Sequence, residues 1–229
     1  MKYISLLSAA IALAGGAACW LMPPATAWSQ SEPQQDVSSS SPSSLPSSRY
    51  APLTLPLGVR LDIPKAWRIL SYEAPSKPVE GSEALLKLAD TKLPEKPARL
   101  FTATAPDSLD AMIYVKVFPS PGGEAKVRAC SDDKLKELAD RIREGLEKLA
   151  KDSGQNILEF YPSKKQVIGK SIALIFSYKR KGIKGDPVMT KMVRLFVGDH
   201  AFTVMLSYPE GDAELAAIIG EVERSIGVE

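Results

Sequence analysis

Two late segments of the chain are apolar on both faces that a β-strand presents, and this pattern limits the possible folds more than any other. In Ser171–Arg180 and in Ala201–Tyr208, side chains alternate as they do in strands. Each apolar face must be covered, so a sheet built from such strands needs packing on both sides. The sequence therefore predicts an α+β domain with helices on both faces of a sheet. The residues concerned are Ile172, Leu174, Phe176 and Tyr178 on one face of the first segment, Ala173 and Ile175 on its other face, and Phe202, Val204, Leu206 and Tyr208 opposite Met205 in the second.

Three segments have the spacing of helices. Asp132–Asp152 carries apolar residues three and four positions apart, with Ser131 placed to cap its first turn. Asp212–Ile226 repeats the pattern and stops at a glycine. A short helix is also expected over Glu83–Leu93.

Further strands are predicted on both sides of the mid-chain helix. Turns at Pro106-Asp107-Ser108 and at Gly198-Asp199-His200 would each join two of them as a hairpin. The expected strands are Val59–Ile63, Trp67–Tyr72, Arg99–Ala105, Ala111–Phe118, Ile157–Tyr161 with an extension to Ile168, and Val188–Val197.

The first 27 residues resemble a secretory signal peptide. A basic residue, Lys2, precedes the apolar run Ile4–Ala18, and Ala25-Thr26-Ala27 provides the small residues that signal peptidase requires. Cleavage is expected before Trp28. Two alternatives stay open: lipid attachment at Cys19, and an uncleaved membrane anchor over Ile4–Met22.

Residues 28–50 are expected to form a disordered tether. Between positions 29 and 48 there are ten Ser, three Pro and three Gln, which cannot bury enough apolar surface to offset the entropy of ordering. A single folded domain is then predicted over residues 51–229.

The composition argues against several classes of function. With 29 basic and 27 acidic residues, the chain lacks the surplus positive charge that nucleic-acid binding requires. His200 is the sole histidine, and Cys130 is the sole cysteine after the signal segment. We expect Cys130 to be a small buried residue and His200 to be a solvated turn residue. The sequence predicts no catalytic residues, no metal ligands and no cofactor.

One loop is locally basic. Lys179, Arg180, Lys181 and Lys184 lie within six residues, followed by Gly185-Asp186-Pro187. Two interpretations are open. The loop is either a solvated hairpin that keeps the sheet soluble, or a contact for an anionic partner or a lipid headgroup.

The order of these elements resembles the PsbP-like superfamily, specifically its bacterial periplasmic DcrB-type members. The resemblance is carried by the strand Gly58–Ile63 followed by Pro64 and Trp67, the long mid-chain helix, and a strand that opens at Gly169 and reaches Tyr178. It continues through the late hairpin and a terminal helix that ends at Ser225-Ile226. It implies an antiparallel αβα sandwich with a binding or assembly role, and it transfers no site residues.

These observations together predict an exported, non-enzymatic accessory module of the bacterial cell envelope, located in the periplasm. Its expected partner is an envelope protein or an anionic membrane surface. Two alternatives remain: a carrier of a small ligand or lipid, and a hydrolase whose site residues are dispersed along the chain.

Overall fold

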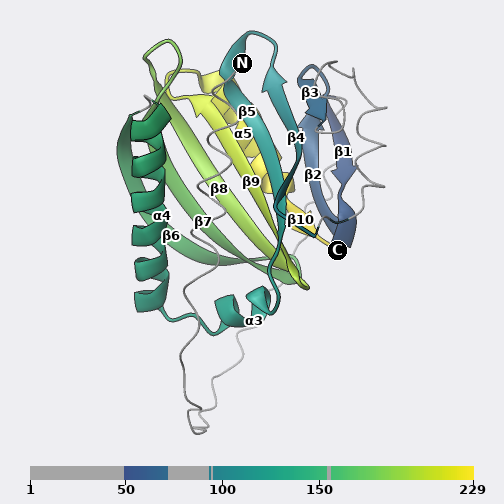
Figure 1. Ribbon diagram of the computed structural model, residues 1–229. Helices are drawn as coiled ribbons and strands as arrows, with labels where there is room; N and C mark the ends of the chain where they lie inside the picture. The colour runs from purple at the N-terminus through teal and green to yellow at the C-terminus, as the bar shows by residue number, and fades with distance from the viewer. Residues whose placement is uncertain (1–48, 72–92, 94, 154–155) are drawn as a thin grey trace, which may run out of the picture.

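A seven-stranded antiparallel sheet lies at the centre of the structure, with strand order β3-β4-β5-β9-β8-β7-β6 (Figure 1). This computed structural model describes residues 49–71, 93, 95–153 and 156–229. The strands span Arg68–Ser71 (β3), Ala98–Ala105 (β4), Ser108–Pro119 (β5), Ile157–Ile168 (β6), Ser171–Lys181 (β7), Pro187–Val197 (β8) and His200–Pro209 (β9). The predicted signal peptide, nearly all of the tether, and the predicted helix Glu83–Leu93 apart from Leu93 lie outside the described residues.

One face of this sheet is covered jointly by a helix and by a second, smaller sheet. The helix α5 (Ala213–Ser225) contributes Ile219 and Val222 to the core, and Asp212 caps its first turn by accepting from the backbone N–H of Leu215. The small sheet is formed by β1 (Tyr50–Thr54), β2 (Val59–Pro64) and β10 (Gly227–Val228), with the 3-10 turn η1 (Pro56–Gly58) between its first two strands. Together they enclose the inward-facing Phe101 and Phe202, neither of which is exposed.

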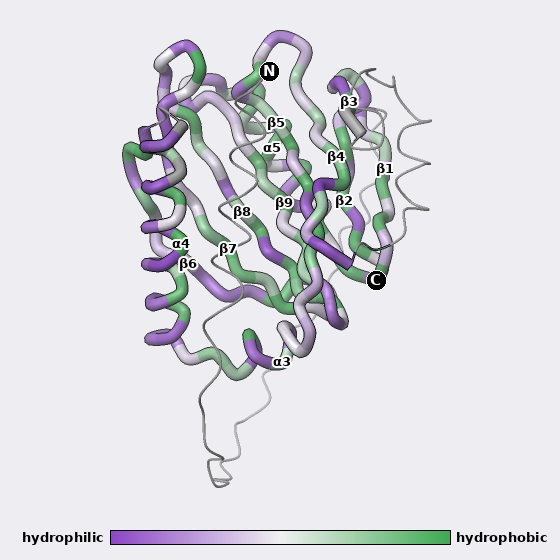
Figure 2. Tube along the Cα trace, viewed as in Figure 1, coloured by the Kyte–Doolittle hydropathy of each residue, from purple (hydrophilic) through white to green (hydrophobic). Residues whose placement is uncertain are grey.

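The other face packs against two helices that follow β5. The long helix α4 (Asp132–Ser153) lies along β6, and the short helix α3 (Gly123–Arg128) contacts β7 and β8. Apolar and polar residues alternate around α4, so that its apolar stripe faces the sheet (Figure 2). Leu135, Ile142 and Leu146 from this stripe join a second buried cluster with sheet residues such as Phe176. No helix within the described residues is both long enough and apolar enough to cross a membrane.

The predicted mixture of helices with an antiparallel sheet is confirmed. On one face of the main sheet the structure differs from the prediction. Helices alone were expected to cover this face, but the small sheet and α5 cover it together. Four elements were not predicted, namely β1, η1, α3 and β10. Each is too short for its apolar residues to repeat at a spacing that identifies a helix or a strand. Tyr50, which was placed in the tether, is buried and paired with Pro64 in the first strand.

The hairpin turn between β6 and β7 is fixed against the end of the chain. Gly169 has a φ of +59°, and a Cβ at this position would collide with the carbonyl oxygen of Val228 in β10. Only glycine combines this left-handed backbone with such a close approach. The turn and the C-terminal strand therefore pack directly on each other.

Candidate binding site

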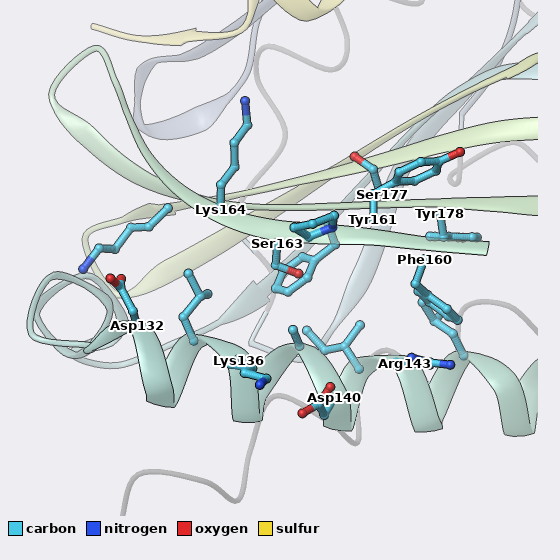
Figure 3. A pocket seen from close by; sticks show the side chains of 17 residues that line it. Asp132, Lys136, Asp140, Arg143, Phe160, Tyr161, Ser163, Lys164, Ser177 and Tyr178 are labelled. Carbon is cyan, nitrogen blue, oxygen red and sulfur yellow. The ribbon is translucent and has the colours of Figure 1, made fainter.

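A groove of about 670 Å³ lies between α4 and the edge of the main sheet (Figure 3). From the helix it is lined by Asp132, Leu135, Lys136, Ala139, Asp140, Ile142, Arg143 and Leu146, and from the strands by Phe160 to Lys165 and Phe176 to Tyr178.

The groove coincides with an irregularity in β6. Tyr161 pairs with Ser177, and the next pair is Lys164 with Ile175, so Pro162 and Ser163 form an extra step in the edge strand. Such a bulge bends a strand and changes which side chains face its neighbour. In Figure 3, Ser163 points toward α4, whereas Lys164 extends to the opposite side of the strand. The bulge therefore occurs where β6 passes the groove.

The floor of the groove is apolar and largely buried. Ile142, Phe176 and Tyr178 are all less than 10% exposed. Phe160 packs on Tyr178 with their ring centroids 5.8 Å apart, and it also lies under the Arg143 guanidinium, 5.2 Å from the ring centre. Burial raises the pKa of Tyr178 to about 12, so its hydroxyl stays protonated near neutral pH. The floor thus offers aromatic and aliphatic surface rather than a reactive group.

The rim of the groove carries exposed charges of both signs. Asp132, Lys136, Asp140 and Arg143 come from successive turns of α4 and are all exposed (Figure 3). Arg143 is held by Glu147 at 2.9 Å, across one helical turn. An apolar floor within a mixed rim is typical of surfaces that bind polypeptide, where an apolar centre is surrounded by polar contacts.

The predicted basic loop is divided by the fold. Lys179 lies on the face of the sheet opposite α4, and its Nζ is 2.7 Å from Glu210 and 3.4 Å from Glu159. The hydrogen bond to Glu210 raises the pKa of Lys179, which is therefore a firmly charged partner in an internal ion network. Tyr161 completes this network by donating to Glu159 at 2.7 Å.

Arg180 points to the other face and is 6% exposed. Its Nη1 lies 3.3 Å from Oδ1 of Asp110 at the start of β5. The second oxygen of Asp110 accepts the backbone N–H of Ile183 at 2.9 Å. Of the four basic residues, Lys181 and Lys184 are the exposed ones, and neither forms an ion pair with another described residue. The structure therefore does not gather the four charges into one surface.

Cys130 and His200 belong to different elements of the fold. Cys130 is half-buried before α4, where its carbonyl accepts from Lys165 at 2.8 Å, and His200 is half-buried at the start of β9. Within the described ranges, no three His, Cys, Asp or Glu side chains are grouped as metal ligands would be. The groove was not predicted, and Pro162 within a polar stretch of β6 was the one local indication of an irregular strand.

Comparison with solved structures shows a PsbP-like fold. The solution structure of the cyanobacterial PsbP protein, CyanoP, from Synechocystis sp. PCC 6803 superposes with a TM-score of 0.51 at 10% identity, covering 83% of this chain and 98% of that one. A crystal structure from Bacteroides thetaiotaomicron has a TM-score of 0.37 at 12% identity, over 75% and 45% of the two chains. PA94 of Pseudomonas aeruginosa, a protein of unknown function, has a TM-score of 0.31 at 14% identity, over 77% and 94%. No protein-family model and no curated protein matches the chain.

Proposed function

We propose that this chain, which has a PsbP-like fold, is an exported, non-enzymatic accessory module that binds a protein of the bacterial cell envelope through the groove between α4 and β6. The observation that carries the proposal is the groove itself, with its buried apolar floor and an exposed rim that carries charges of both signs. The resemblance to periplasmic DcrB-type proteins and the N-terminal segment support the location. A fold of this kind does not determine function, so the proposal depends on the site.

The character of the groove favours a polypeptide over the two alternatives. A lipid carrier is expected to enclose an apolar tail in a deep cavity, whereas here Lys136 and Asp140 stand at an open rim. A hydrolase is expected to bring an activated nucleophile next to a base. Ser163 lines the groove, but within the described residues its hydroxyl makes no hydrogen bond to a carboxylate or an amine of the lining. A peptide with an apolar side and charged flanks matches both parts of the lining.

Export predicts a defined mature N-terminus. If residues 1–27 are a signal peptide, mature protein isolated from the producing cell begins at Trp28, because Ala25 and Ala27 occupy the positions that signal peptidase reads. N-terminal sequencing and intact mass check this. Retention of Met1, or a lipid on Cys19, would contradict the cleavage and favour an anchored form.

Occupancy of the groove can be tested by site-specific photocrosslinking in the producing cell. A photoreactive residue in place of Lys136, on the rim, is expected to give a discrete adduct with an envelope protein. The same residue in place of Ala217, which is exposed on α5 across the sheet, serves as the matched control and should give none. Mass spectrometry of the adduct distinguishes a polypeptide from a small molecule.

A variant that fills the groove makes the test specific. Ala139 is half-buried in the lining, so Ala139→Trp should occupy the cavity and reduce the Lys136 adduct at least fivefold. Ser163→Trp fills the cavity from the opposite wall. It is used in place of Ala139→Trp if that variant has a much lower melting temperature than the wild type. An adduct that persists in both filled variants, or that forms equally at Ala217, would refute binding in the groove. A small molecule in place of a protein would favour the carrier.

A further inference from the structure

The outer edge of β6 is open to a further strand. β6 is the last strand of the main sheet and pairs with β7 alone (Figure 1). Within the described residues, its 12 positions from Ile157 to Ile168 make no main-chain hydrogen bond outside that pairing. An exposed edge of this length presents a row of N–H and carbonyl groups with which the strand of another chain can pair.

This edge is continuous with the groove, because β6 forms the strand wall of both. Side chains directly opposite each other in an antiparallel pair lie on the same face of the sheet. Phe160 pairs with Tyr178 and Val167 pairs with Ile172, and both partners belong to the buried cluster under α4. Phe160 lines the groove, whereas Val167 lies beyond it and is 62% exposed. A strand added to β6 would therefore direct every second side chain toward the groove and toward Val167.

On the opposite face the same stretch of β6 is polar and basic. Lys164 pairs with Ile175 and Gln166 pairs with Ala173, and both partners belong to the core on the α5 side of the sheet. Lys164 extends away from α4 in Figure 3 and is exposed. Among the described residues it has no ion-pair partner. Since opposite charges on neighbouring strands attract, an acidic side chain of an added strand would complement Lys164.

The composition of the edge favours one kind of strand over a second copy of β6. Pro162 has no N–H and lies in the bulge, so regular pairing is offered from Lys164 to Ile168. Lys164 and Lys165 are adjacent in this stretch, and Nζ of Lys165 donates at 2.8 Å to the carbonyl of Cys130 rather than to a carboxylate. Like charges directly opposite each other are destabilising, so edge lysines work against pairing of two identical strands. They favour an acidic strand.

We propose that the partner of the groove docks as an extended acidic segment that adds a strand to the main sheet at the edge of β6. The inference rests on the proposed function, because it states how a polypeptide occupies the same groove. Main-chain hydrogen bonds along the edge supply affinity, while the groove and Lys164 select alternate side chains. The segment carries apolar residues on the side of α4 and acidic residues on the other side.

Synthetic peptides test strand addition on the whole mature chain. The probe is a fluorescently labelled peptide of alternating valine and glutamate, and its control replaces every glutamate with lysine. Fluorescence anisotropy is expected to show that the glutamate peptide binds at least tenfold more tightly than the lysine peptide.

Two methylated forms of the glutamate peptide test the main-chain bonds. One carries N-methyl groups on the valines only, and the other carries them on the glutamates only. Successive residues of a strand direct their main-chain groups to opposite edges. One methylated peptide should therefore lose at least tenfold in affinity, while the other stays within threefold of the parent.

Charge reversal and hydrogen exchange connect the binding to β6. Lys164→Glu should weaken the glutamate peptide at least fivefold and strengthen the lysine peptide, whereas Lys65→Glu, which alters an exposed lysine after β2, should change neither. In the wild-type chain, alternate amides between Lys164 and Ile168 should exchange at least tenfold more slowly when the glutamate peptide is bound. The exchange measurement keeps the test valid if Lys164→Glu fails to fold.

The outcomes separate this inference from the proposed function. If the glutamate peptide does not bind, if both methylated peptides lose affinity equally, or if the β6 amides are unaffected, no strand is added and the inference is wrong. The adduct from Lys136 would then still support a partner in the groove, and only its absence would count against the proposed function. A dimer of the mature chain that the glutamate peptide dissociates would assign the edge to a second copy and overturn the inference.

Discussion

Replacing Asp110 with alanine is expected to lower the free energy of unfolding by about 3–5 kcal/mol, as removal of one partner from a buried ion pair usually does. The side chains of Arg180 and Asp110 are only 7% and 11% exposed. Without the carboxylate, the guanidinium of Arg180 keeps its charge in a buried position, and the backbone N–H of Ile183 loses its acceptor. Both lost interactions join Asp110, near the start of β5, to the end of β7 and the loop that follows it. Urea unfolding followed by circular dichroism measures the change.

A matched control separates burial from charge. Glu137→Ala removes the partner of Arg141 on the outside of α4, where the two side chains are 61% and 46% exposed, and should cost less than about 1 kcal/mol. The double variant Asp110→Leu with Arg180→Met removes both buried charges together. It should recover much of the lost stability, because no uncompensated charge remains. A loss below about 1 kcal/mol for Asp110→Ala would show that Arg180 finds another partner or reaches water.

The divided basic loop shows how far a run of charges can be interpreted without a fold. Lys179 and Arg180 are adjacent, and β7 continues through both of them to Lys181. Side chains at successive strand positions point to opposite faces, so these two residues could not share a surface once the strand was known to extend that far. Their partners, Glu210 and Asp110, are remote in sequence, and no local pattern identifies them. The interpretation of the loop as an anionic contact therefore concerns its two exposed residues, Lys181 and Lys184, and it stays a prediction.

The elements that the sequence predicts are those in which the spacing of apolar residues repeats several times. The helices around Ile142 and Ile219 and the strands through Phe176 and Phe202 have apolar residues repeated often enough to determine both type and buried face. The groove is assembled differently. Its strand wall includes the bulge in β6, which is defined by the pairing of β6 with β7. A single sequence does not reveal such pairing.

The buried face of α4 can be resolved by a pair of truncations one turn apart. Ile142 is 6% exposed and belongs to the cluster with Phe176, whereas Leu138 is half-buried and only borders that cluster. Ile142→Ala is therefore expected to lower the free energy of unfolding by about 2–5 kcal/mol, the usual cost of emptying a buried aliphatic site. Leu138→Ala should cost roughly 1 kcal/mol, because its side chain loses less burial and alanine favours the helix. Lys136→Ala, on the exposed rim, should stay within about 0.5 kcal/mol of wild type.

Urea titration of the three variants measures these differences. An unchanged slope of the free energy of unfolding against urea concentration would show that the variants expose the same surface on unfolding. The ranking matters more than the absolute values, because differences between variants on one helix cancel most of the uncertainty in unfolded-state burial. Ile142 also lines the groove, so its truncation should enlarge that cavity and weaken the crosslink from Lys136. A larger loss for Leu138→Ala than for Ile142→Ala would mean that α4 is rotated about its axis from the orientation described. The groove, whose helical wall depends on that orientation, would then have a different lining.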